Sequence, residues 1–246
     1  METYVMGDIH GNYEGLCECL ELSKFNYATD TLVQLGDVAD GGDRVCDCID
    51  TLLKIPHLIA IKGNHDAWLD EFIKTGYHPA MWQYGGLGTV ASYLNAVKKP
   101  TLFKAAGKGF KVSLNPHDIP KAHQQFFDKQ MLYYIDKNRN CFVHGGFERW
   151  LPFEGQRPEN YYWNRQLWEE ALEWQVKHRF EGFQEPFDMA SDFATIFIGH
   201  NSTLNYGLNL PLKAANIYNL DTGSGKNGRL TIMNVESKQF WQSDRA

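Results

Sequence analysis

Short apolar runs that end in polar clusters dominate the first part of the chain. Such runs cover residues 4–6, 31–35 and 58–61, and each ends in a polar turn that contains glycine. Apolar positions at helical spacing follow, which predicts helices over residues 12–23 and about 43–54 and a further helix after the third run. Three successive strand–turn–helix units predict an α/β sheet whose polar clusters lie along one edge.

From residue 67 the pattern changes to an aromatic-rich, helical one. The glycine-rich piece at 84–88 lacks the Lys and Ser/Thr of a phosphate-binding loop, so we interpret it as a turn. A later helix is expected over residues 120–129. We predict a single domain over residues 1–246, in which residues 67–118 form a helical, aromatic-rich cap.

The last part of the chain is richer in strands. One helix, which contains residues 162–168, is expected among them. Apolar or alternating runs predict strands at 131–136, 141–143, 195–198, 217–220, 229–235 and 239–242. The fold therefore begins with strand–helix units and finishes with a run of strands.

Composition and charge exclude several classes of function. The chain has 246 residues, 43% of them hydrophobic and 22% charged, which are globular values. A net charge of −6 argues against an extended footprint on a nucleic-acid duplex. The sequence has no apolar run of membrane-spanning length and no basic-then-apolar leader. We therefore expect a cytoplasmic protein with neither a membrane nor a nucleic-acid duplex as partner.

The five cysteines form no obvious framework. They stand at positions 17, 19, 46, 48 and 141. The two Cys-x-Cys pairs fall inside predicted helices, where side chains two apart diverge. We interpret all five as reduced thiols rather than as zinc ligands or disulfides.

The first polar cluster suggests metal chemistry. Asp8 and His10 follow the first strand and, two residues apart in extended chain, share a face. A carboxylate oxygen beside an imidazole nitrogen suits a divalent transition metal such as Mn, Fe or Zn. The alternative is a polar strand end that caps the next helix.

The remaining clusters carry a family resemblance. The ordered motifs are GDIHG at 7–11, GDVADGG at 36–42, GNHD at 63–66, HGG at 144–146 and GH at 199–200. This order resembles the phosphoprotein phosphatases, the calcineurin-like binuclear metallophosphoesterases. The tail at 219–235 is similar to bacterial and phage members, and YWNR at 162–165 resembles a segment of the serine/threonine protein phosphatase of phage lambda. The resemblance implies a central β-sandwich flanked by helices, in four layers α/β/β/α, with two metals at the sheet edge.

The resemblance also implies a ligand set. It assigns Asp8, His10 and Asp37 to the first metal, and Asp37, Asn64, His144 and His200 to the second. Each of these residues follows a predicted strand. Mn²⁺ is the first choice for both positions, with Fe or Zn as alternatives.

A hydroxide that bridges the two metals would attack phosphorus directly. His65 is the candidate acid for the leaving oxygen, and Asp40 would hydrogen-bond its other ring nitrogen. The family usually has Asp-Arg-Gly where this sequence has Asp40-Gly41-Gly42, so one phosphate-binding arginine is missing. Arg165 matches the other, and Arg44 is a candidate replacement.

Three functions remain open at this stage. The leading hypothesis is hydrolysis of phosphomonoesters by a serine/threonine protein phosphatase, with a phosphorylated protein or a small phosphoester as substrate. The alternative is a nucleotide hydrolase of the symmetrical diadenosine tetraphosphatase type, which needs the same metal cluster. The third is a non-catalytic metal-binding module, supported only by the missing arginine.

Overall fold

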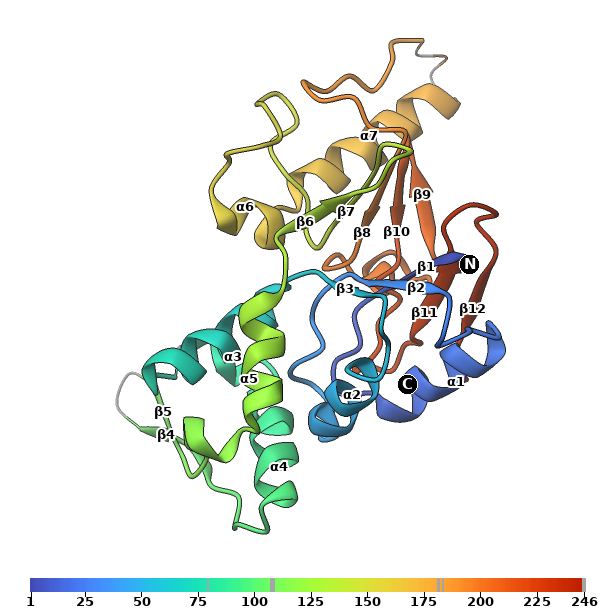
Figure 1. Ribbon diagram of the computed structural model, residues 1–246. Helices are drawn as coiled ribbons and strands as arrows, with labels where there is room; N and C mark the ends of the chain where they lie inside the picture. Colours follow the sequence, from blue (N-terminus) through green and yellow to red (C-terminus); the bar gives the residue numbers. More distant parts are fainter. Residues whose placement is uncertain (79, 107–108, 181, 183, 245–246) are drawn as a thin grey trace.

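Two five-stranded mixed sheets lie face to face at the centre of the molecule (Figure 1). The structure is a computed structural model that describes residues 1–78, 80–106, 109–180, 182 and 184–244. The first sheet has the order β12-β11-β1-β2-β3 and the second the order β6-β7-β8-β10-β9. The strands of the first sheet are β1 (Thr3–Met6), β2 (Thr31–Gln34), β3 (Leu58–Ala60), β11 (Thr231–Asn234) and β12 (Phe240–Gln242). Those of the second are β6 (Tyr133–Ile135), β7 (Asn140–Val143), β8 (Thr195–Ile198), β9 (Leu212–Ala214) and β10 (Ile217–Asn219).

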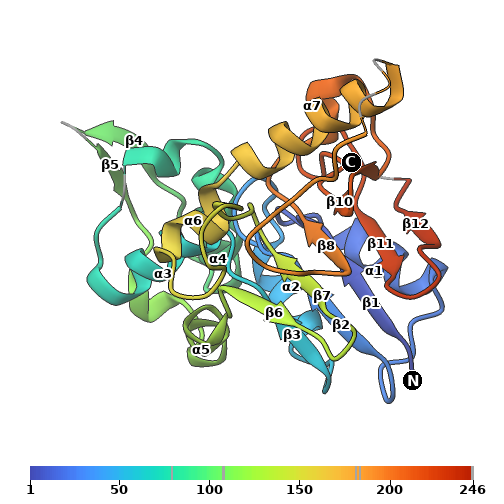
Figure 2. The same ribbon diagram turned by 90° about the horizontal axis from the view of Figure 1, so that it is seen from above.

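Helices cover the outer face of each sheet. The first sheet is covered by α1 (Tyr13–Leu22) and α2 (Val45–Leu52), and the second by α6 (Pro158–Trp163) and α7 (Gln166–Phe180) (Figures 1 and 2). This confirms the predicted four-layer α/β/β/α fold. Parallel pairing joins β1 to β2 and β2 to β3 in one sheet, and β7 to β8 and β8 to β10 in the other. Parallel strands end at the same edge, so each sheet brings several strand ends together there.

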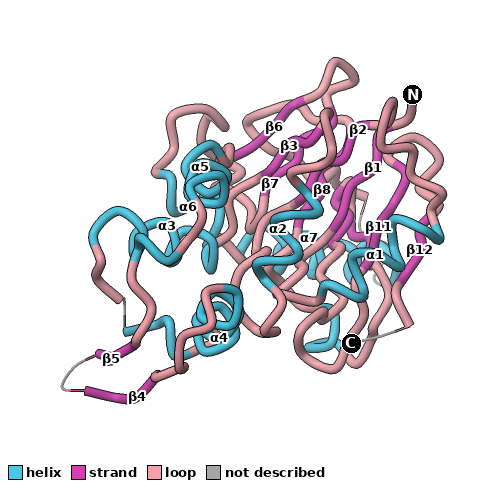
Figure 3. The backbone as a smooth tube through the Cα atoms, turned by 60° about the horizontal axis from the view of Figure 1, so that its bottom comes forward, coloured by secondary structure: helices cyan, strands magenta, loops and turns pink. Residues whose placement is uncertain are grey.

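A lobe built from residues 64–129 stands beside the first sheet. It contains α3 (Asn64–Thr75), α4 (Gly86–Ala96) and α5 (Lys121–Lys129), with 3₁₀ turns at Ala80–Gln83 and Pro116–Asp118. A third 3₁₀ turn, Thr203–Tyr206, lies outside the lobe. An antiparallel hairpin of β4 (Phe103–Ala106) and β5 (Gly109–Val112) projects from the lobe (Figure 3). The helical, aromatic-rich cap expected at 67–118 thus also contains a hairpin, whose four-residue strands are too short for their alternation to be distinguished from a helical pattern.

The glycine-rich piece at 84–88 is only partly the turn that was expected. Gly85 has φ +115, and α4 begins at the next residue. The backbone N–H of Gly41 donates to the carbonyl of Gly85 at 3.1 Å, and a Cβ on Gly88 would lie 2.4 Å from the carbonyl oxygen of Gly41. The glycines allow α4 to approach the loop that follows β2, a contact that local sequence does not reveal.

Two further sequence predictions need correction. The single helix around residues 162–168 is two helices, because α6 ends at Trp163 and α7 begins at Gln166. Asn164 makes the break: it follows α6, and its side-chain oxygen accepts a hydrogen bond from the N–H of Leu167 at 2.9 Å. Strand β9 was not predicted; it pairs antiparallel with β10 and carries too little alternation to be recognised alone.

An apolar layer holds the two sheets together. Phe142 on β7 and Phe197 on β8 stack at 5.0 Å with ring planes 7° apart, and both are fully buried. Val5 and Val33 of the first sheet belong to the same buried cluster. The polar strand ends at the sheet edge are thus fixed relative to one another by apolar packing between the sheets.

Truncating this layer should weaken the whole fold. Phe197→Ala is expected to lower the free energy of unfolding by about 3–5 kcal/mol, because it removes a buried ring and leaves a cavity. Phe180→Ala is the matched control: that ring is 72% exposed, and its loss should change stability by about 0.5 kcal/mol or less. Urea unfolding of both variants measures the difference, and equal losses would contradict the assignment of the inter-sheet core.

Candidate metal centre

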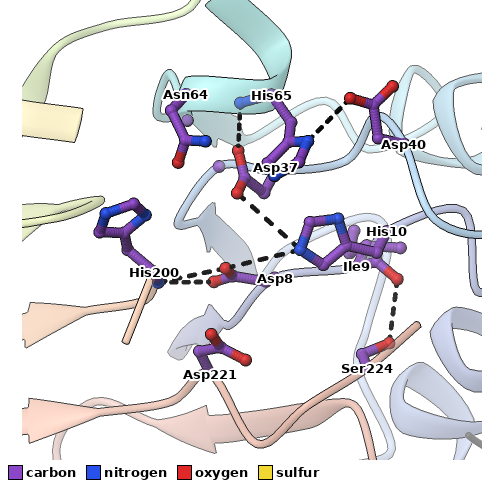
Figure 4. A network of polar contacts seen from close by, with 12 residues as sticks. Asp8, Ile9, His10, Asp37, Asp40, Asn64, His65, His200, Asp221 and Ser224 are labelled. Carbon is purple, nitrogen blue, oxygen red and sulfur yellow. Dashed lines mark hydrogen bonds and ion pairs between the residues drawn. The ribbon is translucent and has the colours of Figure 1, made fainter. Parts of the chain in front are cut away.

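The polar residues at the strand ends converge on one site where the two sheets meet (Figure 4). All six residues that sequence analysis assigned to metal are buried: Asp8, His10, Asp37, Asn64, His144 and His200. His10, Asp37, Asp40 and His200 have φ between +50 and +69, a region that non-glycine residues seldom adopt. The chain is therefore strained at the points that aim these side chains into the site.

Asp37 lies at the centre of this group. Its Oδ2 is 3.3 Å from Nε2 of His144 and 3.8 Å from Nε2 of His10. Its Oδ1 accepts a hydrogen bond from the backbone N–H of His65 at 2.9 Å. One carboxylate thus faces both sheets, as a ligand shared by two metals must.

The histidine rings are oriented as metal ligands are. Nδ1 of His10 lies 3.1 Å from the carbonyl of Ala39, and Nδ1 of His144 lies 2.7 Å from the carbonyl of Leu35. A carbonyl only accepts hydrogen bonds, so each Nδ1 carries a proton and each Nε2 faces the site, where it can bind a metal once it has no proton. Nε2 of His200 is buried and has no hydrogen-bond partner among the described residues.

Two overlapping sets of ligand atoms can each hold an ion. One consists of His10, Asp37 and His65, the other of Asp37, His144 and His200, and within each set the atoms lie within 4.8 Å of one another. Asp8 and Asn64 complete the surroundings. Oδ2 of Asp8 is 4.0 Å from Nε2 of His10, and Oδ1 of Asn64 is 3.2 Å from Nε2 of His144. This donor set of nitrogen and oxygen fits two divalent transition metals.

Charge in the site is concentrated on Asp37 and His144. Burial alone would raise the pKa of Asp37, but the facing His144 and His65 rings outweigh it and hold that pKa well below its usual range. Burial likewise opposes the charged form of His144, yet Asp37 and Asp8 raise its pKa to about 10. Burial lowers the pKa of His10 to about 4, so its Nε2 is free of a proton at neutral pH.

Asp221 is a buried carboxylate that sequence reasoning left without a role. It follows β10 and lies next to Asp8 in the site (Figure 4). Burial, followed by the charge of Asp221, raises the pKa of Asp8 well above its usual range. The signal that could have found Asp221 is the same one that found the others, namely a carboxylate directly after an apolar strand.

His65 and Asp40 form the expected hydrogen-bonded pair beside the candidate metal ligands. Nδ1 of His65 is 2.7 Å from Oδ2 of Asp40. The other oxygen of Asp40 accepts hydrogen bonds from the indole N–H of Trp82 at 2.9 Å and the hydroxyl of Thr89 at 2.6 Å. Although burial disfavours the charged ring, Asp37 and Asp40 outweigh it and raise the pKa of His65. The lobe thus fixes the partner of the candidate acid.

The candidate phosphate-binding arginines differ in their surroundings. Nη1 of Arg165 donates to the carbonyl of His200 at 2.9 Å and to Oδ1 of Asn201 at 3.1 Å, which anchors the guanidinium at the edge of the site. Arg44 forms ion pairs with Glu14 and Asp47 instead. Of the two, Arg165 has the freer guanidinium.

Lys226 is a cation that sequence reasoning missed. Its positive charge acts on His10 and on Asp221, and its side chain is exposed. No motif marks it in the sequence, where it lies in the loop between β10 and β11.

Asp66, the last residue of the GNHD motif, holds the loop after β2. Its carboxylate accepts hydrogen bonds from the backbone N–H groups of Asp37, Val38 and Ala39 at 2.9–3.0 Å, and from the side chain of Gln130 at 2.7 Å. Asp66 therefore positions Asp37 without facing the ligand cluster itself.

The ordered strand-end residues and their geometry match a known protein family. Residues 1–204 match the sequence profile of the calcineurin-like phosphoesterases. The chain belongs to this family. The family predicted from the order of the motifs is confirmed at this level.

The relatives include two kinds of phosphoesterase. The serine/threonine-protein phosphatase 2 of Escherichia coli is 37% identical over 83 residues, which are 34% of this chain and 37% of that protein. A symmetrical bis(5'-nucleosyl)-tetraphosphatase of Coxiella burnetii is 34% identical over 67 residues, only 23% of its own length. The enzyme of the same name from Neisseria gonorrhoeae is 24% identical over 288 positions, covering 100% of this chain and 96% of that protein.

Solved structures share the fold over the full chain. A provisionally assigned diadenosine tetraphosphatase superposes with a TM-score of 0.64 at 15% identity, covering 98% of this chain and 92% of that one. A metallophosphoesterase from Sphaerobacter thermophilus has a TM-score of 0.55 at 16% identity, covering 100% and 90%. At such identities the likeness extends to the fold alone. Within the described residues, no helix is long and apolar enough to cross a membrane.

The geometry of Gly41 explains why the family arginine cannot stand there without strain. Gly41 has φ +82, and a Cβ would lie 3.1 Å from both Cβ and the carbonyl oxygen of His10. Gly41→Arg should therefore lower the free energy of unfolding by roughly 1–2 kcal/mol, the cost of a non-glycine residue in a left-handed conformation. The contact with His10 should add to this loss.

Gly155→Arg separates these two costs. Gly155 has the same φ of +82, but a Cβ added there would have nothing within 4 Å. Urea unfolding should show a larger loss for Gly41→Arg than for Gly155→Arg. Equal losses would mean that the contact with His10 has no energetic effect.

Proposed function

We propose that this protein hydrolyses dinucleoside polyphosphates in the manner of a symmetrical diadenosine tetraphosphatase. The observation that carries this proposal is a pair of tryptophans beside the candidate metal centre. The rings of Trp68 and Trp163 lie 5.5 Å apart. Trp68 is also 4.7 Å from the ring of His65, and Trp163 is 5.6 Å from the ring of His200.

The two tryptophans line a pocket of about 460 Å³. The remaining lining residues are Lys62, Ala67, Asp70, Glu71, Lys74, Thr75 and Tyr162. Indole rings bind nucleobases by stacking, which a phosphoserine peptide does not require. Asp70 lines this pocket, and its Oδ2 forms ion pairs with Lys62 and Lys74.

Cations near both ends of the site suit a chain of phosphates. Arg165 is anchored beside His200, and Lys226 exerts its charge on His10. A guanidinium fork can bind a phosphate through two hydrogen bonds, whereas the ammonium acts as a point charge.

The proposed roles in the reaction follow from the geometry. Asp8, His10, Asp37, Asn64, His144 and His200 would hold two divalent cations, with Mn²⁺ as first choice and Fe or Zn as alternatives. When bound, these cations polarise phosphoryl oxygens and lower the pKa of water. His65 would donate the proton on Nε2 to the leaving oxygen, because its Nδ1 is occupied by Asp40. Asp40, held by Trp82 and Thr89, would keep that ring in place.

A protein phosphatase is the second candidate function. Sequence analysis placed it first, and the 37% identity to the Escherichia coli phosphatase over 83 residues supports it. That match covers only 37% of the phosphatase, however, whereas the Neisseria tetraphosphatase matches over 96% of its length. The complete donor set also argues against a non-catalytic module.

Variants at the tryptophans test the nucleotide proposal. Trp68→Ala and Trp163→Ala should each raise KM for diadenosine tetraphosphate roughly 5- to 150-fold, since stacking of one base is worth about 1–3 kcal/mol. The KM for an alkyl phosphate, which has no ring to stack, should change much less. Trp150→Ala is the control, because that ring is 61% exposed and stacks on Arg149 instead. Equal effects on both substrates would exclude a base-binding role.

Variants at Asp37 and His65 separate metal binding from acid catalysis. Asp37→Asn should lose both bound metal and activity, because it removes the charge shared by the two ligand sets. His65→Asn should retain both metals and lose about 10²–10⁴-fold in rate on an alkyl phosphate, the range of a positioned acid. The loss on p-nitrophenyl phosphate should be smaller, since its leaving group needs little protonation. Elemental analysis of each variant is the second readout, and loss of a metal from His65→Asn would make His65 a ligand.

A further inference from the structure

A second cluster of potential metal ligands lies where α2 meets α5. Cys46 and Asp50 come from α2, and His123 comes from α5. One ligand atom from each lies within 4.8 Å of the other two. None of the three belongs to the candidate metal centre at the strand ends, so the function proposed above does not account for them.

The local structure brings these three residues together. Cys46 and Asp50 are four residues apart on one helix and therefore share a face. The backbone N–H of Cys46 donates to the hydroxyl of Ser92 at 2.9 Å, which fixes the start of α2 against α4. Nε2 of His123 is 3.0 Å from Oδ1 of Asp50.

His123 has the hydrogen bonding of a metal-binding histidine. The residue is only 1% exposed, and its Nδ1 lies 3.1 Å from the hydroxyl of Tyr93 on α4. A partner at Nδ1 that fixes the ring and leaves Nε2 to the ion is the usual arrangement around metal-bound imidazoles. Burial raises the pKa of Tyr93 well above its usual value, so the hydroxyl stays neutral.

The negative charges around Cys46 favour the binding of a cation. Burial, with Asp50 and Asp47, raises the pKa of the Cys46 thiol to about 11. Among the ion pairs formed by the described residues, Asp47 has Arg44 as its partner while Asp50 has only His123. A divalent ion would compensate Asp50 and the thiolate together.

We propose that Cys46, Asp50 and His123 bind a Zn²⁺ ion, with water in the fourth position. One sulfur, one nitrogen and one oxygen ligand suit zinc better than Mn²⁺, which prefers oxygen. The Asp50 side chain is 59% exposed, which leaves an open side for water. Binding forms a zinc–sulfur bond and releases the thiol proton of Cys46 to solvent. The ion would link α2 to the lobe. Cys46 would then be a zinc ligand, which differs from its interpretation as a reduced thiol.

Cobalt is a specific probe for this site, because a thiolate ligand gives Co²⁺ an intense charge-transfer absorption. The proposed catalytic ligands contain no cysteine, so the band reports on Cys46 even when cobalt fills every site of the full-length protein. We expect the band in the unmodified protein and in Cys17→Ser, and its disappearance in Cys46→Ser. Added Zn²⁺ should abolish it by displacing the cobalt.

Two further measurements test the proposal even if Cys46→Ser fails to fold. Asp50→Asn alters a partly exposed side chain and should weaken cobalt binding at this site at least tenfold while the circular dichroism spectrum stays unchanged. Apparent Zn²⁺ affinity should also fall about tenfold for each unit that the pH is lowered, because one thiol proton must leave. Absence of the band in the unmodified protein, or its persistence in Cys46→Ser, would overturn the proposal. Neither outcome bears on the tetraphosphatase activity, which is measured separately.

Discussion

The buried carboxylate of Asp37 is the interaction on which the rest of the structure depends. It lies in a buried part of the site. His144, which follows a strand of the second sheet, is on one side of it, and His10 and His65, which follow strands of the first sheet, are on the other. A lone carboxylate there would be costly, because burial removes it from water. The neighbouring histidines compensate that cost in part, and bound cations would complete it. The loop that carries Asp37 is itself fixed by the three backbone hydrogen bonds to Asp66.

The lobe between residues 64 and 129 contributes Asn64 and His65 to this centre and also holds His65 in position. Trp82 and Thr89 hold Asp40, and Asp40 in turn holds His65. Gly85 and Gly88 let α4 approach the loop after β2 closely enough to make those contacts. The zinc site proposed between α2 and α5 would brace the same junction. The position of the proposed acid therefore depends on how the lobe packs, as well as on its own helix.

Sequence analysis anticipated the fold and the convergence of the strand-end residues because both depend on local patterns. An apolar run followed by a polar cluster is visible in sequence, and parallel strands bring such clusters to one edge. Trp68 and Trp163 come from segments far apart in the chain, so their pairing could not be foreseen. The same reason hides the influence of Lys226 on the site and the approach of His123 to Cys46. The break at Asn164 was missed because its side-chain cap depends on geometry rather than on hydrophobic periodicity.

The central claim is that a dinucleoside polyphosphate, rather than a phosphoprotein, is the preferred substrate of this metal-dependent site. The most direct measurement is a competition, in which the Mn²⁺-loaded protein receives diadenosine tetraphosphate and a phosphoserine peptide together and the products of both are quantified. Our account predicts preferential consumption of the nucleotide, with ADP as its sole nucleotide product. Release of phosphate from the peptide while diadenosine tetraphosphate stays intact would contradict it.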